Sequence, residues 1–73
     1  MLKKRSVSIK GHGTSISLEE DFWVALKEIA SHKNLSLNAL IEWVDANRSF
    51  QEDNLSSAIR VYVLRHYQQK KEN

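Results

Sequence analysis

The sequence predicts a small, mostly helical domain that begins with a short β-ribbon and relies on a second copy of itself. Three observations support this fold class. The chain has 73 residues and no cysteine, so a single core without disulfides must hold it together. Polar and apolar residues alternate near the N-terminus, and the apolar residues after position 18 recur with helical spacing. A core of this size rarely contributes more than about 3–5 kcal/mol to the free energy of unfolding, so we expect oligomerisation to add the missing stability.

The composition excludes several classes of protein. Hydrophobic residues make up 41% and charged residues 27% of the chain, as in a folded domain rather than a disordered one. No apolar run approaches the roughly 20 residues of a membrane-spanning helix. The basic start at residues 1–5 lacks the apolar stretch of a signal peptide. We therefore expect a cytoplasmic protein with no membrane partner.

Charge is unevenly distributed along the chain, although the net charge is only +2. Residues 1–18 contain four basic and no acidic residues, residues 19–53 contain three basic and eight acidic ones, and residues 54–73 contain four basic and one acidic. A basic segment without acids suits a polyanionic partner, because neutralising phosphates releases counterions. A solubilising tail has the same composition, so charge alone leaves nucleic-acid binding open.

Two stretches of alternating polar and apolar residues predict strands, at residues 5–9 and at residues 14–18. The two glycines of the chain, Gly11 and Gly13, lie between these stretches and favour a turn or a bulged kink. The pattern fits a hairpin and equally one long kinked strand. We assign residues 14–18 to the ribbon strand and residues 1–13 to a basic arm or an additional strand.

Three helices are predicted after the strand. The first covers residues 19–33, and acidic residues crowd its first turn, where carboxylates favour the positive end of the helix dipole. The second covers residues 36–47, with Ser36 as its N-cap. The third covers residues 54–69. Its apolar stripe is too wide for one contact, so we expect this helix to touch both its own subunit and a partner.

No catalytic or metal-binding motif is present in the sequence. Nucleophile-elbow, P-loop and zinc-protease signatures are absent, and the three histidines follow no ligand spacing. We therefore expect neither an enzyme nor a cofactor nor a metal site. His12, which lies between two glycines and near basic residues, is a candidate for phosphate contact.

A short strand, an acidic helix start, an amphipathic helix, a tight turn and a serine-capped second helix follow one another in the run TSISLEEDFWVALKEIASHKNLSLNALIEWV. In this order and spacing the run resembles a ribbon-helix-helix DNA-binding domain, the fold of Arc-type repressors. The longer string from KRSVSIKGHG to NLSSAIRVYVL is similar to a subfamily of short bacterial ribbon-helix-helix proteins. The resemblance implies an intertwined homodimer in which one strand of each subunit pairs across a two-fold axis. The third helix extends this minimal fold.

The resemblance also implies a function, that of a transcriptional repressor whose ribbon enters the major groove of double-stranded DNA. Family members read bases with three alternating polar strand residues and hold phosphate at the start of the second helix. The matching base-contacting positions are Gly13, Ser15 and Ser17, where Gly13 departs from the long basic residue of many relatives. The phosphate-contacting candidates, including the basic arm, are Lys3, Lys4, Arg5, Lys10, His12, Asn34, Leu35 and Ser36.

The apolar strand and helix positions predict the shared core of the dimer. Ile16 and Leu18 should point inward, with Thr14 on the same side of the strand. Trp23 and Trp43 have the spacing of interface residues rather than of base-stacking ones. The full predicted dimer core is Ile16, Leu18, Phe22, Leu26, Ile29, Leu40, Ile41 and Val44.

Two other functions stay open at this point. The same fold serves as a dimerising protein-interaction module, as in antitoxins, and the C-terminal helix is then the binding element. A single-stranded RNA or DNA binder would instead use Trp23, Trp43 and the basic arm. For the DNA regulator, we expect two dimers on adjacent half-sites.

Overall fold

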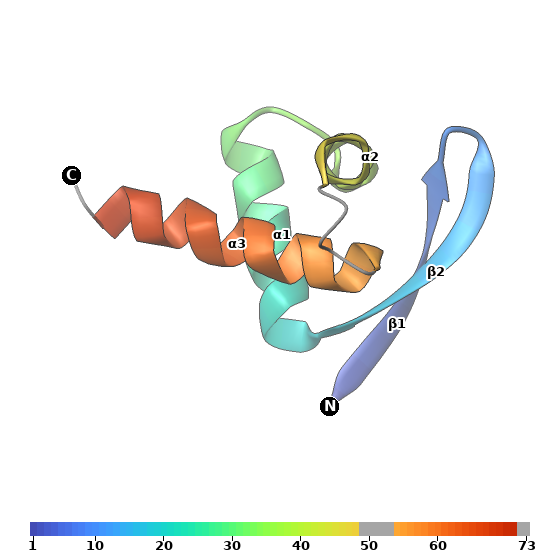
Figure 1. Cartoon of the computed structure of the whole chain (residues 1–73), viewed down its shortest axis with the longest axis horizontal. Coiled ribbons are helices and arrows are strands. Elements are labelled where there is room, and N and C mark those ends of the chain that lie inside the picture. The colour runs from blue at the N-terminus through green and yellow to red at the C-terminus, as the bar shows by residue number, and fades with distance from the viewer. Residues whose placement is uncertain (49–53, 72–73) are drawn as a thin grey trace.

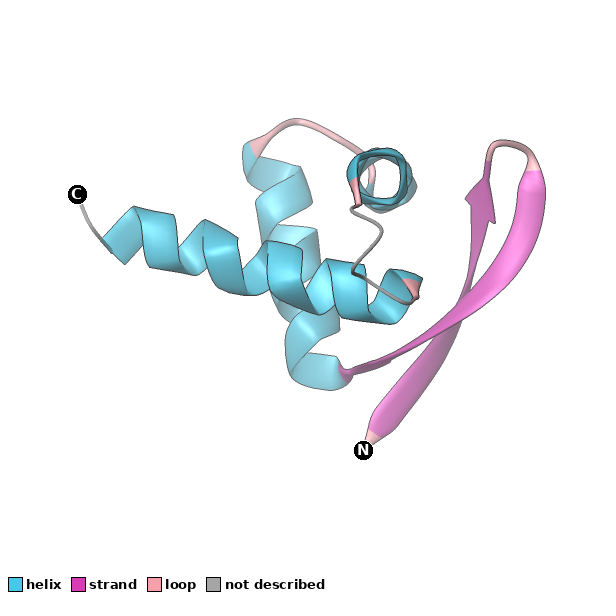
Figure 2. Ribbon diagram, in the orientation of Figure 1, coloured by secondary structure: helices cyan, strands magenta, loops and turns pink. Residues whose placement is uncertain are grey.

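In residues 1–48 and 54–71, which the computed structural model describes, a β-hairpin is followed by three helices (Figures 1 and 2). The helices lie together on one side of the hairpin, so one face of the hairpin is covered and the other is free (Figure 1). The elements are β1 (Leu2–Ile9), β2 (His12–Glu19), α1 (Glu20–His32), α2 (Leu37–Asn47) and α3 (Leu55–Lys71).

A two-residue turn makes the N-terminal segment a hairpin rather than one kinked strand. Lys10 and Gly11 have φ angles of 53° and 81°, and positive φ at both turn residues gives the type I′ geometry that matches the twist of paired strands. β1 and β2 pair antiparallel, with Ser6 opposite Ser15. Residues 2–9 thus form a full strand, and β2 is longer than the expected ribbon strand.

This pairing decides between the two alternatives for residues 1–13. Residues 2–9 form an additional strand rather than an arm, and β2 pairs with β1 of the same chain, because the left-handed turn at Lys10 and Gly11 reverses the chain after the first strand. One edge of β2 is therefore satisfied within a single copy.

Local hydrogen bonds set the turn between α1 and α2. Asn34 adopts a left-handed conformation with φ 57°, and the Leu35 N–H donates to the Ala30 carbonyl at 2.9 Å, a common way to end a helix. The Ser36 hydroxyl accepts from the Ala39 N–H at 3.0 Å. Ser36 is thereby confirmed as the N-cap of α2.

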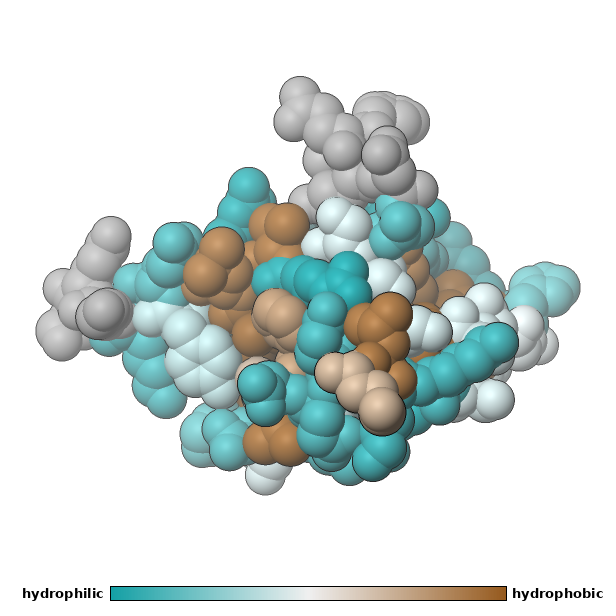
Figure 3. Space-filling view, turned by 90° about the horizontal axis from the view of Figure 1, so that it is seen from below, coloured by the Kyte–Doolittle hydropathy of each residue, from teal (hydrophilic) through white to brown (hydrophobic). Residues whose placement is uncertain are grey.

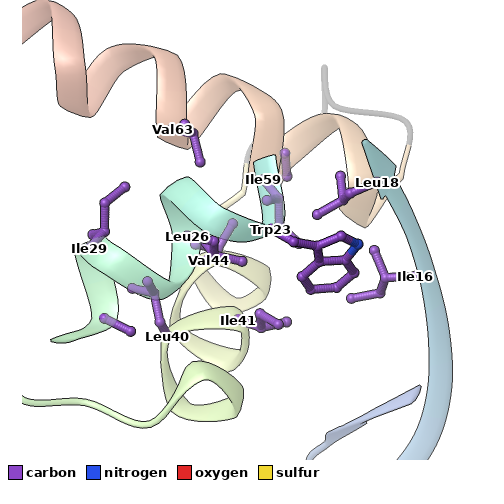
Figure 4. Close-up of a cluster of buried hydrophobic side chains, with 12 residues drawn as sticks. Ile16, Leu18, Trp23, Leu26, Ile29, Leu40, Ile41, Val44, Ile59 and Val63 are labelled. Atoms are coloured by element: carbon purple, nitrogen blue, oxygen red, sulfur yellow. The ribbon is translucent and has the colours of Figure 1, made fainter. Parts of the chain in front are cut away.

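The core lies between the inner face of the hairpin and the helices (Figure 4). Ile16 and Leu18 of β2 are 3% and 0% exposed, whereas Thr14, on the same face of the strand, is exposed near the turn. Trp23 is fully buried beside these β2 residues, and its indole N–H donates to the Lys3 carbonyl of β1 at 2.9 Å. The other buried residues are Leu26, Ile29 and Ala30 of α1, Leu40, Ile41 and Val44 of α2, and Ala58, Ile59 and Val63 of α3.

α3 closes this core within one copy. Its buried side chains, Ala58, Ile59 and Val63, belong to the same cluster as the residues predicted for the dimer core. Of those predicted residues only Phe22 is partly exposed; the others are buried without a second chain. Trp43, in contrast, is 52% exposed on the surface of α2. Contacts of these residues with a second copy stay a prediction.

Aromatic rings form a row on the surface shared by α2 and α3. The rings of Trp43 and Tyr62 lie 5.7 Å apart, those of Tyr62 and His66 6.5 Å apart, and those of His66 and Tyr67 5.1 Å apart. The imidazole of His66 is therefore partly screened from water by two neighbouring rings.

We expect His66 to make the fold less stable as the pH falls below about 6.5, the ordinary pKa of histidine. Burial, followed by the positive charges of Lys70, Lys33 and His32, lowers the pKa of His66 in the folded chain. The unfolded chain binds the proton more tightly, so acid favours unfolding. Urea unfolding midpoints at pH 7.5 and pH 5.5 should differ more for the wild type than for His66→Gln. An equal decrease in both proteins would contradict the expectation.

Candidate nucleic-acid interface

The outer face of the hairpin is the surface that points away from the helices. Side chains alternate between the two faces of a strand, and Ile16 and Leu18 point inward, so Ser15 and Ser17 point outward. The register then fixes which residues of β1 share the outer face. Its members, opposite one another in pairs, are Lys4 and Ser17, Ser6 and Ser15, and Ser8 and Gly13.

The outer face is polar, and basic residues lie at its rim. Its four serines carry short hydroxyls that both donate and accept hydrogen bonds, which suits the edges of base pairs. Ser17 is partly exposed and the other five residues are exposed. Lys4 lies towards one end of β1, and the exposed Lys10 lies in the turn at the other end. The space-filling view from below shows hydrophilic residues over much of the molecular surface (Figure 3).

Two basic residues of the N-terminal arm lie on the inner face instead. Lys3 Nζ is 3.2 Å from Glu20 Oε2. The guanidinium of Arg5 lies over the Trp23 ring, 5.4 Å from its centroid. His12 is paired with Ile9 at the turn end of the same face. Strand alternation therefore separates Lys4 from its two basic neighbours, and only Lys4 of the three points to the outer face.

The residues predicted to hold phosphate at the start of α2 lie beside β1. Asn34 and Leu35 are exposed in the turn, and the Ser36 hydroxyl is engaged in capping. One residue further into the helix, Asn38 contacts β1 directly. Its Oδ1 accepts from the Ser8 N–H at 2.9 Å, and its Nδ2 donates to the Ser8 carbonyl at 2.8 Å. The start of α2 is thereby fixed next to the hairpin.

The sequence pattern did not indicate these contacts between α2 and β1. Glu42, one helical turn after Asn38, accepts from the Lys10 N–H through Oε2 at 2.9 Å. Asn38 and Glu42 are spaced four residues apart and so occupy the same helix face. That spacing was the only available signal, and it gives no information about which strand the face meets.

At the opposite end of the hairpin, Glu19 and Arg60 connect β2 to α3. Arg60 Nε donates to Glu19 Oε1 at 3.0 Å. A backbone hydrogen bond, followed by the bond from Arg60, lowers the pKa of the Glu19 carboxyl. Glu19 therefore keeps its negative charge at neutral pH, next to the positive charge of Arg60.

A family model for the ribbon-helix-helix domain matches residues 2–67. The chain belongs to the ribbon-helix-helix family. A solved structure, that of an uncharacterized protein from Bordetella pertussis Tohama I, is similar to it with a TM-score of 0.84 and 32% sequence identity. The match covers 99% of this chain and 60% of that one. A search among curated proteins finds no match.

Members of the ribbon-helix-helix family are generally DNA-binding regulators. The three strand positions predicted to contact bases, Gly13, Ser15 and Ser17, lie together on the outer face of β2. Among the described residues, no cluster of histidine and acidic side chains is arranged to hold a metal ion. No helix in the same part of the chain is both long and apolar enough to cross a membrane.

We expect position 13 to accept a larger residue, because a Cβ placed there meets no atom within 4 Å and its φ is not positive. Replacing Gly13 with Lys should raise thermal stability slightly, since glycine in a strand costs about 0.5–1 kcal/mol. It should also tighten binding to duplex DNA by adding a cation to the outer face. Differential scanning fluorimetry and fluorescence anisotropy measure the two effects.

Gly11→Lys is the matched control, because its φ of 81° strains any side chain. This control should lose stability. Loss of stability in Gly13→Lys, or retention in Gly11→Lys, would contradict the assignment of the two glycines.

Proposed function

We propose that the protein is a sequence-specific double-stranded DNA-binding transcriptional regulator that acts through the outer face of its hairpin. The observation that carries the proposal is this exposed face of serines with Lys4 and Lys10 at its rim. Small polar side chains allow the backbone to approach the bases closely, and lysines at the rim attract phosphates. Family membership supports the same class of partner.

The width of the sheet determines how it meets DNA. A second copy that pairs along β2 gives four strands, and three strand spacings of about 4.8 Å put the outer strands about 14 Å apart. The major groove is about 12 Å wide. The two central strands therefore fit inside the groove, while each β1 lies over a phosphate wall. Gly13, Ser15 and Ser17 then face the bases, and Lys4 and Lys10 face the phosphates.

The start of α2 supplies a second phosphate contact in this proposal. Ser36 caps the helix through Ala39, which leaves the first backbone N–H groups of α2 directed along the helix axis. These groups, with the positive end of the helix dipole, attract an anion that lies beyond the turn at Asn34 and Leu35. The hydrogen bonds between Asn38 and Ser8 keep this helix start beside β1.

A second candidate function is binding of a protein partner at the surface of α2 and α3. A pocket of about 310 Å³ is lined by Lys33, Leu35, Leu40, Trp43 and Tyr62. Trp43 and Leu35 are 52% and 42% exposed there, and exposed aromatic residues are common at protein interfaces. This surface is built from helices rather than from the outer hairpin face. One chain can therefore carry both functions.

We expect Lys4→Ala to weaken binding of a mixed-sequence duplex and to reduce the salt slope by about one per lysine removed. Lys3→Ala is the matched control. It removes the same charge from the same strand, but Lys3 lies on the inner face next to Glu20. A fluorescence anisotropy titration at several salt concentrations measures both variants. Equal losses in the two variants would refute the assignment of the outer face.

Replacing Ser15 and Ser17 together with Ala should reduce sequence preference more than total affinity, because phosphate contacts are kept while hydroxyl contacts to bases are lost. A bidentate base contact is worth about 1–3 kcal/mol of discrimination, and a single serine hydroxyl contributes less. The measurement compares binding to duplexes selected by the wild-type protein with binding to an unselected pool. The matched control is Ser6→Ala on the flanking strand. An unchanged preference in the double variant would remove these serines from base recognition.

A further inference from the structure

The two edges of the hairpin are built differently. On the outer edge of β1, both backbone groups of Ser8 are hydrogen bonded to the amide of Asn38, at 2.9 and 2.8 Å. The next exposed donor, the Lys10 N–H, is bonded to Glu42 at 2.9 Å. The Asn38 amide thus occupies the place that a neighbouring strand would take. α2 itself lies beside the turn end of the hairpin (Figure 1).

Charge protects the rest of the β1 edge. Residues 3–5 are Lys, Lys and Arg, so two β1 strands that paired antiparallel would bring six positive charges into one short segment. Like charges on facing strands destabilise a pair. Arg5 also points inward over the Trp23 ring, and an inward-pointing charge is a known way to keep an edge strand from pairing. Leu2, Lys4 and Ser6 also direct their backbone groups to this edge, and α2 does not hydrogen bond to them in the described part of the chain.

The outer edge of β2 has none of these protections. Ser8 directs its backbone N–H and carbonyl groups away from β2, and its partner Gly13 directs its own away from β1. Because this orientation alternates along a strand, the backbone groups of Ser15 and Ser17 also point to the outer edge of β2. No residue in the described part of the chain hydrogen bonds to these groups. Between His12 and Glu19 the strand carries no charged residue. This edge is open, uncharged and lined by small side chains.

The difference between the closed β1 edge and the open β2 edge decides how copies of the chain assemble. A hairpin with two open edges forms two separate two-fold contacts, β2 with β2 and β1 with β1, and alternation of the two contacts builds a chain without an end. Closing one edge leaves a single self-complementary contact. Assembly then stops at two copies.

We propose that Asn38 and Glu42 close the β1 edge, so that a second copy of this chain pairs only along β2 and strand pairing ends at a four-stranded dimer. The proposal rests on the β2 pairing of the proposed function and adds the device that limits it. Asn38 and Glu42 are positioning residues, since they act on the backbone of β1 rather than on a ligand. The face that binds DNA is then the same in every assembled copy.

The test measures molar mass by light scattering over a hundredfold range of protein concentration. The wild type should stay at two copies. Asn38→Ala combined with Glu42→Ala, measured at about 1 M salt to screen the charges of residues 3–5, should give larger species whose mass rises with concentration. Asn47→Ala is the matched control, because Asn47 lies on the same helix but, among the described residues, its side chain donates to the Trp43 carbonyl at 2.8 Å rather than to β1. This control should stay at two copies.

Each outcome separates the two proposals. If the wild type and the double variant both form only dimers, β2 pairing stands and the role of Asn38 and Glu42 is refuted. If the wild type is a monomer and the double variant associates, the edge closure stands and β2 pairing is refuted. If the wild type and the double variant are both monomers, β2 pairing and edge closure are both refuted. Should circular dichroism show the double variant unfolded, Asn38→Asp replaces it, since Asp still accepts from Ser8 but cannot donate to its carbonyl.

A pair of proline variants identifies the edge that pairs. Ser15 and Ser6 face each other in the hairpin and direct their N–H groups to opposite outer edges. Proline removes this donor and is tolerated only where no strand needs it. Ser15→Pro should therefore reduce the molar mass to one copy, whereas Ser6→Pro should keep two. The reverse result would assign pairing to β1 and overturn the proposal.

Discussion

The left-handed turn at Lys10 and Gly11 is the constraint on which the rest of the structure depends. Positive φ angles at both residues fold residues 2–9 back onto β2, and every later feature uses the register that follows. That register puts Arg5 and Val7 on the inner face beside Ile16 and Thr14. It also brings the Lys3 carbonyl to the Trp23 indole. A turn of another type would splay the strands apart and separate these contacts.

Much of the fold followed from local patterns in the sequence. The alternation around Ile16 and Leu18 predicted their burial, and Ser36 was identified as a helix cap from its residue type and position. The sequence does not decide between a hairpin and one kinked strand, because Gly11 and Gly13 both favour irregular backbone. The structure shows that, of these two glycines, only Gly11 has positive φ. Nothing in the local pattern of two glycines separated by one residue shows which of them forms the turn and which belongs to the strand.

The candidate interface was harder to predict than the fold. Lys3, Lys4 and Arg5 form one basic run in the sequence, and composition treats them alike. The strand separates them, because neighbouring residues point to opposite faces and the pairing with β2 sets which face is covered. Asn38 lies shortly after Asn34, Leu35 and Ser36, which are predicted to contact phosphate. Its bonds to Ser8 join segments 30 residues apart, and such contacts have no local signature.

The two tryptophans occupy opposite environments. Trp23 is fully enclosed in the core with the Arg5 guanidinium over its ring, whereas Trp43 is 52% exposed on α2. Indole fluorescence shifts to longer wavelength in water, so replacing either tryptophan with Phe leaves a single optical probe in a known environment. The emission of Trp23 reports the opening of the hairpin from the helices. The emission of Trp43 reports whatever approaches the helical surface, and neither signal needs an added label.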